Sequence, residues 1–103
     1  MLNQFVCVGR VVDQPKKITT KDGLILSLAI LRNYKNAEGV YETDFIDVIV
    51  KGDIANQCAE YIHKGDIVGV KGHLETDNSV IGVIAEKVTF LSDKKSEESE
   101  DEE

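Results

Sequence analysis

The chain has 103 residues, which is enough for one domain with a single hydrophobic core and excludes a second core. Acidic residues outnumber basic residues by 19 to 12, but residues 93 to 103 alone carry a net charge of −5, so residues 1 to 92 carry only −2. The acidic composition is therefore mostly a property of the C-terminal segment, and it does not exclude an anionic partner for the rest of the chain.

The two cysteines, Cys7 and Cys58, lie in apolar patterns, and we expect them to be small buried side chains rather than part of a disulfide framework. The N-terminal residues do not have the pattern of a cleaved leader, and no apolar run approaches membrane-spanning length. We therefore expect a protein of the reducing cytoplasm with no membrane partner.

Residues 2 to 12 are nearly all apolar or small and form the first predicted strand, interrupted only by Gly9-Arg10. A strand that is apolar on both faces is usually covered on both faces, and the chain offers only one helix. A partner subunit is one natural cover. Alternatively, the strand switches faces at Gly9, which would act as a bend or bulge. The pattern favours neither interpretation.

Residues 13 to 17 read as a turn, and Lys21-Asp22-Gly23 is a hairpin signal of the Asp-Gly type. The second predicted strand covers residues 24 to 31 and leads into the polar stretch 32 to 36. Ala37-Glu38-Gly39 then turns the chain. Every second residue of this strand is aliphatic, which gives one apolar face, and the opposite face carries small residues. The expected core residues are Leu24, Leu26, Leu28 and Ile30, and the opposite residues are Ser27 and Ala29.

Residues 44 to 70 read as strand, helix and strand. In the first of these strands Ile46, Val48 and Val50 form the expected buried face, opposite an outward face of mixed chemistry. Asp53 is expected to cap the helix and Gly65 to end it, so the helix is predicted over residues 53 to 64. The outward residues of the strand are Phe45, Asp47, Ile49 and Lys51, and the core face of the helix comprises Ile54, Cys58, Tyr61 and Ile62.

The remaining strands are predicted over residues 67 to 74 and 80 to 91, joined by a tight polar connection at residues 76 to 79. Glycines within these two strands permit strong coiling. Five strands with one helix between the third and the fourth fit a small, nearly closed barrel. The predicted fold is all-β with one helix, and its order β-β-β-α-β-β is that of the five-stranded OB-fold barrel. We expect this domain to span residues 1 to 91 and residues 92 to 103 to be a disordered acidic tail.

Candidates for enzymatic chemistry are few. His63 and His73 are the only imidazoles, and neither has the short spacing to cysteine that a zinc site requires. No phosphate-binding loop or nucleophile elbow is present. Asp44 and Asp47 fall on opposite faces of one strand, so the sequence predicts no carboxylate pair there. We expect no enzymatic activity, no metal and no cofactor.

A stronger pattern favours nucleic-acid binding, in which aromatic faces stack on bases and cations follow the backbone. Tyr34 is flanked by Arg32 and Lys35, and Phe45 shares an outward face with Lys51. A phenylalanine at a strand start is more often a core residue than a stacking platform, and cations such as Arg32 and Lys35 are often ordinary solvated side chains, so a protein-binding barrel is a close alternative. Further cations that could extend the track are Arg10, Lys16, Lys17, Lys21 and Lys71. Packing roles are predicted for Tyr41, Tyr61 and Phe90.

An ordered set of motifs spans residues 1 to 91: Met1-Leu2-Asn3, Val8-Gly9-Arg10, Arg32 to Asn36 followed by Gly39, Asp44-Phe45-Ile46, Lys64-Gly65-Asp66, Val70 to Leu74, and Ala85-Glu86 through Phe90-Leu91. As a set these motifs resemble the bacterial and phage single-stranded DNA-binding protein family. The resemblance implies an OB-fold that coats single-stranded DNA with little sequence preference, usually as a homotetramer built by pairing first strands.

By this resemblance Tyr34 and Phe45 fall where the family has base-stacking aromatics, and Arg10 and Arg32 where it has cations. It also implies an oligomer interface on the first strand. The complete set of expected DNA-binding residues is Arg10, Arg32, Tyr34, Lys35, Phe45, Lys51, Lys71 and His73. The expected interface residues are Leu2, Gln4, Val6 and Val8.

The chain departs from the family pattern in several places. Lys51 stands where the family has another stacking aromatic, and His73 stands where arginine is common, which weakens the cationic track near neutral pH. Residues 76 to 79 are far shorter than the family's hairpin, which carries a further aromatic. The family's acidic tail ends in an apolar tip that recruits repair and replication proteins, whereas this chain ends Asp101-Glu102-Glu103. We therefore expect weaker binding, a smaller footprint and no recruitment through such a tip.

The resulting hypothesis is non-enzymatic, non-sequence-specific binding and protection of single-stranded DNA in replication, recombination or repair. The expected location is the cytoplasm, at the nucleoid or in a phage-infected host. The alternative is an OB-fold adaptor, similar to primosomal adaptors, that acts mainly through protein contacts.

Overall fold

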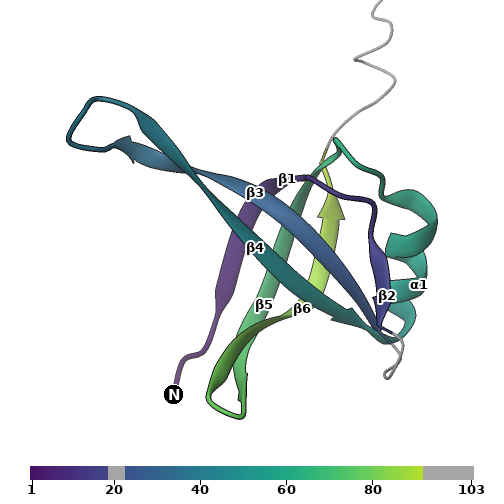
Figure 1. Ribbon diagram of the computed structural model, residues 1–103. Coiled ribbons are helices and arrows are strands. Elements are labelled where there is room, and N and C mark those ends of the chain that lie inside the picture. The colour runs from purple at the N-terminus through teal and green to yellow at the C-terminus, as the bar shows by residue number, and fades with distance from the viewer. Residues whose placement is uncertain (19–22, 92–103) are drawn as a thin grey trace, which may run out of the picture.

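The computed structural model describes residues 1–18 and 23–91, so the expected turn before Gly23 and the expected acidic tail lie outside the described residues. Within these ranges the chain forms strands and one helix that follow one another in the order drawn in Figure 1. The elements are β1 (Phe5–Val11), β2 (Lys16–Ile18), β3 (Gly23–Lys35), β4 (Tyr41–Lys51), α1 (Gly52–Tyr61), β5 (Ile67–Asp77) and β6 (Val80–Phe90).

The strands form one sheet in the order β1-β5-β6-β4-β3-β2, and a further pairing between β1 and β3 closes it into a barrel. Neighbouring strands are antiparallel except β4 and β6, which pair in parallel around Val48↔Val83. The short β2 runs beside the start of β3. The predicted five-stranded barrel is therefore confirmed, with α1 between β4 and β5 at one end of the barrel (Figure 1). The strand β2 was missed, because its residues were interpreted as a turn.

The core follows the period-2 pattern of the sequence. Alternate residues of β3 and β4 point inward, and Leu26, Leu28, Val48 and Val50 are completely buried. The helix closes one end of the barrel with Ala55 and Cys58, and Ile62, directly after it, packs into the same core. Cys58 is buried and Cys7 is half-buried; both are free thiols, and burial raises the pKa of each.

Strand β1 keeps one alternation throughout its length. Gly9 and Val11 are buried on the core side, whereas Val6 and Val8 are 69% and 56% exposed. The proposed switch of faces at Gly9 is therefore wrong. Gly9 is instead the point where β1 passes close to β3, since a Cβ atom there would lie 2.9 Å from the carbonyl oxygen of Ala29. The second apolar face of β1 stays exposed in the single chain.

The helix differs from its prediction at both ends. It begins at Gly52 with Lys51 as an extended N-cap, so Asp53 lies within the first turn and is not the capping residue. It ends at Tyr61, and Gly65 takes its left-handed conformation in the turn that follows. Tyr61 is 62% exposed rather than packed. The packing roles predicted for Tyr41 and Phe90 are also wrong, because both side chains are nearly half exposed.

Strands β3 and β4 are longer than predicted, and their joined ends extend beyond the barrel (Figure 1). We call residues 31 to 43 the β3–β4 arm. Its tip contains the predicted turn, in which Asn36 Oδ1 accepts from the backbone N–H groups of Glu38 and Val40. The β5–β6 hairpin closes at Asn78 and Ser79, both with positive φ, as expected for a two-residue turn that follows the twist of the strands.

Candidate nucleic-acid interface

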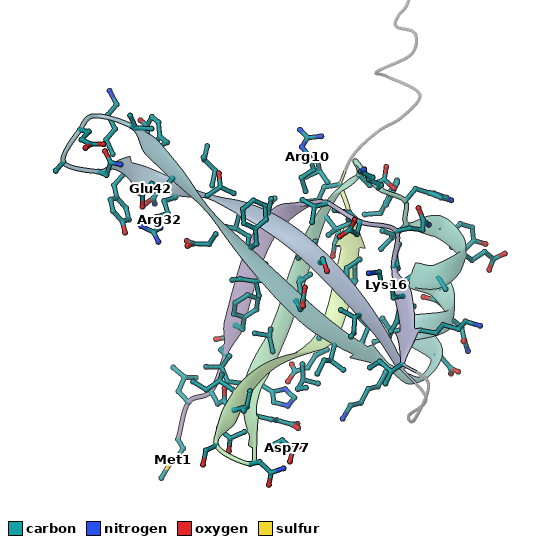
Figure 2. All side chains as sticks on the ribbon, in the orientation of Figure 1. Met1, Arg10, Lys16, Arg32, Glu42 and Asp77 are labelled. Atoms are coloured by element: carbon teal, nitrogen blue, oxygen red, sulfur yellow. The ribbon has the colours of Figure 1, made fainter. Side chains whose placement is uncertain are left out.

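An exposed aromatic side chain lies on the outward face of β4. Phe45 is 72% exposed and is aligned with Ala29 of β3, and Ala29 is in turn aligned with Arg10 of β1. Aligned residues of neighbouring strands share a face. Arg10 and Phe45 therefore flank a small alanine on one outward surface, which leaves the phenylalanine ring open to a flat ligand. Figure 2 shows Arg10 extending from the barrel, and its Nη1 donates to the carbonyl of Gly65.

A groove of about 510 Å³ continues from this surface, between β3–β4 and the β5–β6 hairpin. Its apolar lining includes Ile25, Ile49 and Ile81. Among the described lining residues there is one cation, Lys51, and there are three carboxylates. The carboxylates are those of Asp47, Glu75 and Asp77.

Arg32 lies on the arm and is held by carboxylates. Its Nε and Nη2 donate to the two carboxylate oxygens of Asp44, each at 2.9 Å, and its Nη1 donates to Glu42 Oε1 at 2.6 Å. Glu42 also accepts from Asn36 Nδ2. Figure 2 shows Arg32 and Glu42 side by side on the arm. The hydrogen bonds and charge of Asp44 raise the pKa of Arg32, and Arg32 in turn lowers the pKa of Asp44. Arg32 therefore braces the arm across its two strands.

The other arm residues remain accessible. Tyr34 is 60% exposed and close enough to Arg32 to contribute to its raised pKa. Lys35 Nζ lies 5.7 Å from the ring centroid of Tyr41, a cation–π contact across the two strands. The arm thus presents one accessible aromatic and one cation that already contacts a ring.

The two β5 candidates are separated by an irregularity in the pairing with β6, between Lys71 and Gly72. Lys71 is aligned with Val6 and Lys87 on the outer surface of β1, β5 and β6, away from the groove. His73 is aligned with Ile84, which lines the groove.

The imidazole of His73 contacts two carboxylates. Its Nε2 lies 2.7 Å from Glu75 Oε2 and its Nδ1 lies 2.6 Å from Glu86 Oε2. Hydrogen bonds to Glu75 and Glu86 raise the pKa of His73, so the ring keeps its charge to a higher pH than an ordinary histidine. The two carboxylates nevertheless neutralise the charge of His73. In the same way, Asp44 and Glu42 neutralise the charge of Arg32.

The structure therefore brings Arg10, Phe45 and Lys51 onto one surface, with His73 beside the groove and Arg32, Tyr34 and Lys35 on the arm. Lys71 is not part of this arrangement. The prediction missed the contribution of the β5–β6 hairpin, whose Val80 and Ile81 line the groove. The consecutive apolar residues Val80 and Ile81 carry no signal of their own, because only the pairing with β5 shows which way they point.

Among residues 1–18 and 23–91 no cluster of three or more histidine, cysteine or acidic side chains could hold a metal ion. In the same part of the chain, α1 is too short and too polar to cross a membrane.

A closed barrel with its one helix between β4 and β5, and with an open aromatic on its outer surface, fits the OB-fold class of binding proteins. Residues 2–91 match the Single-strand binding protein family, and the chain belongs to that family. It is 36% identical over 112 residues to single-stranded DNA-binding protein 1 of Staphylococcus aureus, with 97% of this chain and 72% of the relative covered.

Two solved structures share the fold. The Thermus aquaticus single-stranded DNA-binding protein superposes with a TM-score of 0.74 at 23% identity, over 91% of this chain and 52% of that one. The Plasmodium falciparum SSB in complex with single-stranded DNA superposes with a TM-score of 0.71 at 24% identity, over 89% and 96% of the two chains.

Proposed function

We propose that this chain binds and protects single-stranded DNA during replication, recombination or repair, without reading a sequence motif and without a catalytic step. Family membership supports the proposal, and the open ring of Phe45 beside the groove is the observation that carries it. Base stacking on an aromatic ring is sequence-tolerant, because every base has a π-face. A protein with this partner would work in the cytoplasm at the nucleoid, and that location is part of the proposal.

The proposed interface depends more on stacking than on charge. Tyr34 and Phe45 are the two proposed platforms, and Arg10 and Lys51 are the proposed phosphate contacts. Arg32 and His73 are matched by carboxylates, which reduces what each can offer a phosphate. The short β5–β6 hairpin adds aliphatic rather than aromatic surface. We therefore expect a small footprint and a shallow dependence of affinity on salt.

The test is fluorescence anisotropy of a labelled single strand titrated with the protein at several salt concentrations, with the duplex as control. Two phosphate contacts predict a slope of log K against log salt of about −1.4, since each contact to a single strand contributes about −0.7. Preference for the single strand with a shallow slope would support the proposal. Absence of binding at low salt would overturn it and favour the alternative of an adaptor that acts through protein contacts.

We further propose that the chain assembles with copies of itself, as a homotetramer or a dimer. Gly9 and earlier residues of β1 pair with β5, whereas pairing with β3 is confined to Arg10 and Val11. The start of β1 therefore has a second edge that no described strand covers. Its exposed face carries the predicted interface residues Val6 and Val8, and the other two, Leu2 and Gln4, are exposed just before the strand.

Light scattering coupled to size-exclusion chromatography tests this assembly. Val6→Glu should lower the measured mass towards that of a monomer, because it puts a charge into an apolar contact. Val80→Glu is the matched control, since Val80 is equally exposed, at 68%, but lies on the β5–β6 hairpin. A monomeric wild-type protein, or an equal effect of both substitutions, would argue against pairing through β1.

A further inference from the structure

The groove beside Phe45 has a composition that suits bases and repels phosphates. Its lining is largely aliphatic, and Asp47 from β4 faces a rim that includes Glu75 and Asp77 from β5. Phosphate oxygens brought among these carboxylates would meet like charge, with Lys51 as the one described cation of the lining. A single strand in this groove would therefore place its bases toward the floor and its phosphates toward solvent.

Asp47 occupies the position where a base edge would arrive. It lies two residues beyond Phe45 on the same face of β4, at about 7 Å along the strand. Next on this face comes Ile49, which lines the groove. A base stacked on the ring of Phe45, or the base that follows it, would therefore present its hydrogen-bonding edge to the carboxylate of Asp47.

The carboxylate of Asp47 is held in place by the neighbouring strand. Ser27 is aligned with Asp47 across β3 and β4, and its hydroxyl donates to Asp47 Oδ1 at 2.6 Å. Within the described part of the chain, the other oxygen, Oδ2, has no hydrogen-bond partner, and Asp47 is exposed. One oxygen thus fixes the orientation, and the second is available to a ligand.

An ionised carboxylate can only accept hydrogen bonds. Cytosine N4, adenine N6 and guanine N2 are amino donors that suit it, whereas thymine presents carbonyl oxygens on either side of its one N3–H. An Oδ2 that accepted from thymine N3–H would bring these carbonyl oxygens close to a negative charge.

We propose that Asp47, oriented by Ser27, is a specificity-determining residue that makes the groove prefer bases with an exocyclic amino group over thymine. The inference rests on the proposed binding of single-stranded DNA and adds a preference in base composition to it.

The experiment compares oligo-dC with oligo-dU of equal length by anisotropy at constant salt near neutral pH. These oligomers differ only in the substituent at C4 and the proton at N3, so ring size and backbone charge are matched. Wild-type protein should bind oligo-dC about fivefold more tightly, which is the lower end of what a good base contact provides, because Asp47 is exposed.

Asp47→Asn should bring the ratio of the two dissociation constants close to one, because an amide can both donate and accept. Ser27→Ala should lower the ratio by a smaller factor, since the carboxylate remains but loses its orientation. Asp53→Asn is the matched control: it removes one negative charge from the first turn of α1, outside the groove lining. It should shift both affinities equally and leave the ratio unchanged.

A wild-type ratio near one, with both oligomers bound, would overturn this inference and leave the proposed function standing. A ratio that survives Asp47→Asn would also overturn it. Failure of both oligomers to bind at low salt would overturn the proposed function and the inference together.

Discussion

Replacing Phe45 by alanine should separate binding from folding. Because the ring is 72% exposed and is aligned with the small Ala29, its truncation leaves no cavity in the core. Surface substitutions of this kind usually change the free energy of unfolding by less than about 0.5 kcal/mol. The melting temperature of the variant should therefore match that of the wild type.

Binding should respond much more strongly. Stacking of one base on an aromatic side chain contributes about 1 to 3 kcal/mol, and each 1.4 kcal/mol is a factor of ten in the dissociation constant. Phe45→Ala should therefore raise the dissociation constant for a single strand by roughly 5- to 140-fold. Phe45→Trp, which keeps an aromatic face at the same position, should retain affinity.

The assay is anisotropy of a labelled mixed-sequence oligonucleotide at one salt concentration, with thermal melting of each variant in parallel. Tyr61→Ala is the matched control, since Tyr61 is a comparably exposed aromatic, at 62%, on α1 rather than on the barrel face. The stacking mechanism would be refuted if Phe45→Ala left the dissociation constant unchanged, or if Tyr61→Ala weakened binding as much.

Three further outcomes follow from single side chains. Lys51→Ala should make the salt slope shallower by about 0.7, measured by the same anisotropy titration; an unchanged slope would remove Lys51 from the phosphate contacts. Glu75 and Glu86 raise the pKa of His73 above its ordinary 6.5, so its contribution to stability is complete below that pH and is lost as the pH rises through the raised pKa. Between about pH 6 and pH 8 the melting temperature of the wild type should fall more than that of His73→Gln, and parallel curves would contradict this. Gly72→Ala should lower the melting temperature strongly, because its Cβ would overlap the backbone carbonyl of Ile84; a wild-type melting curve would show that β5 can shift there.

The barrel could be predicted because its central strands have a simple periodicity. In β3 and β4 every second residue is aliphatic and buried, and the intervening residues are small, polar or aromatic and face outward. That alternation is sufficient to place Phe45 and Lys51 on one surface, since both occupy odd positions of a regular strand. The same reasoning failed for α1, where a plausible acidic cap one residue inside the helix obscured the start at Gly52.

The site was harder to predict, because its details depend on which residues face one another across strands. The ion pairs of Arg32 require the register that sets it opposite Asp44 and Glu42, and the shift between Leu31 and Lys35 leaves no trace in the local sequence. A similar irregularity in the pairing of β5 with β6 sets Lys71 beside Lys87 and His73 beside Ile84, and of these two partners Ile84 lines the groove. Two side chains that are close in the sequence thus have different neighbours.

These pairings change the physical character of the interface. A row of free cations would attract any polyanion, including duplex DNA, and would discriminate poorly between them. Here Arg32 is occupied in bracing the arm that carries Tyr34, and the groove is lined by aliphatic side chains and carboxylates. Such a surface favours a strand whose bases are unpaired and can turn inward to stack. A duplex, which hides its bases and presents only phosphates, has little to gain from it. We therefore expect the preference for single strands to come as much from repulsion of phosphates by the carboxylates of the groove as from stacking of bases on Phe45.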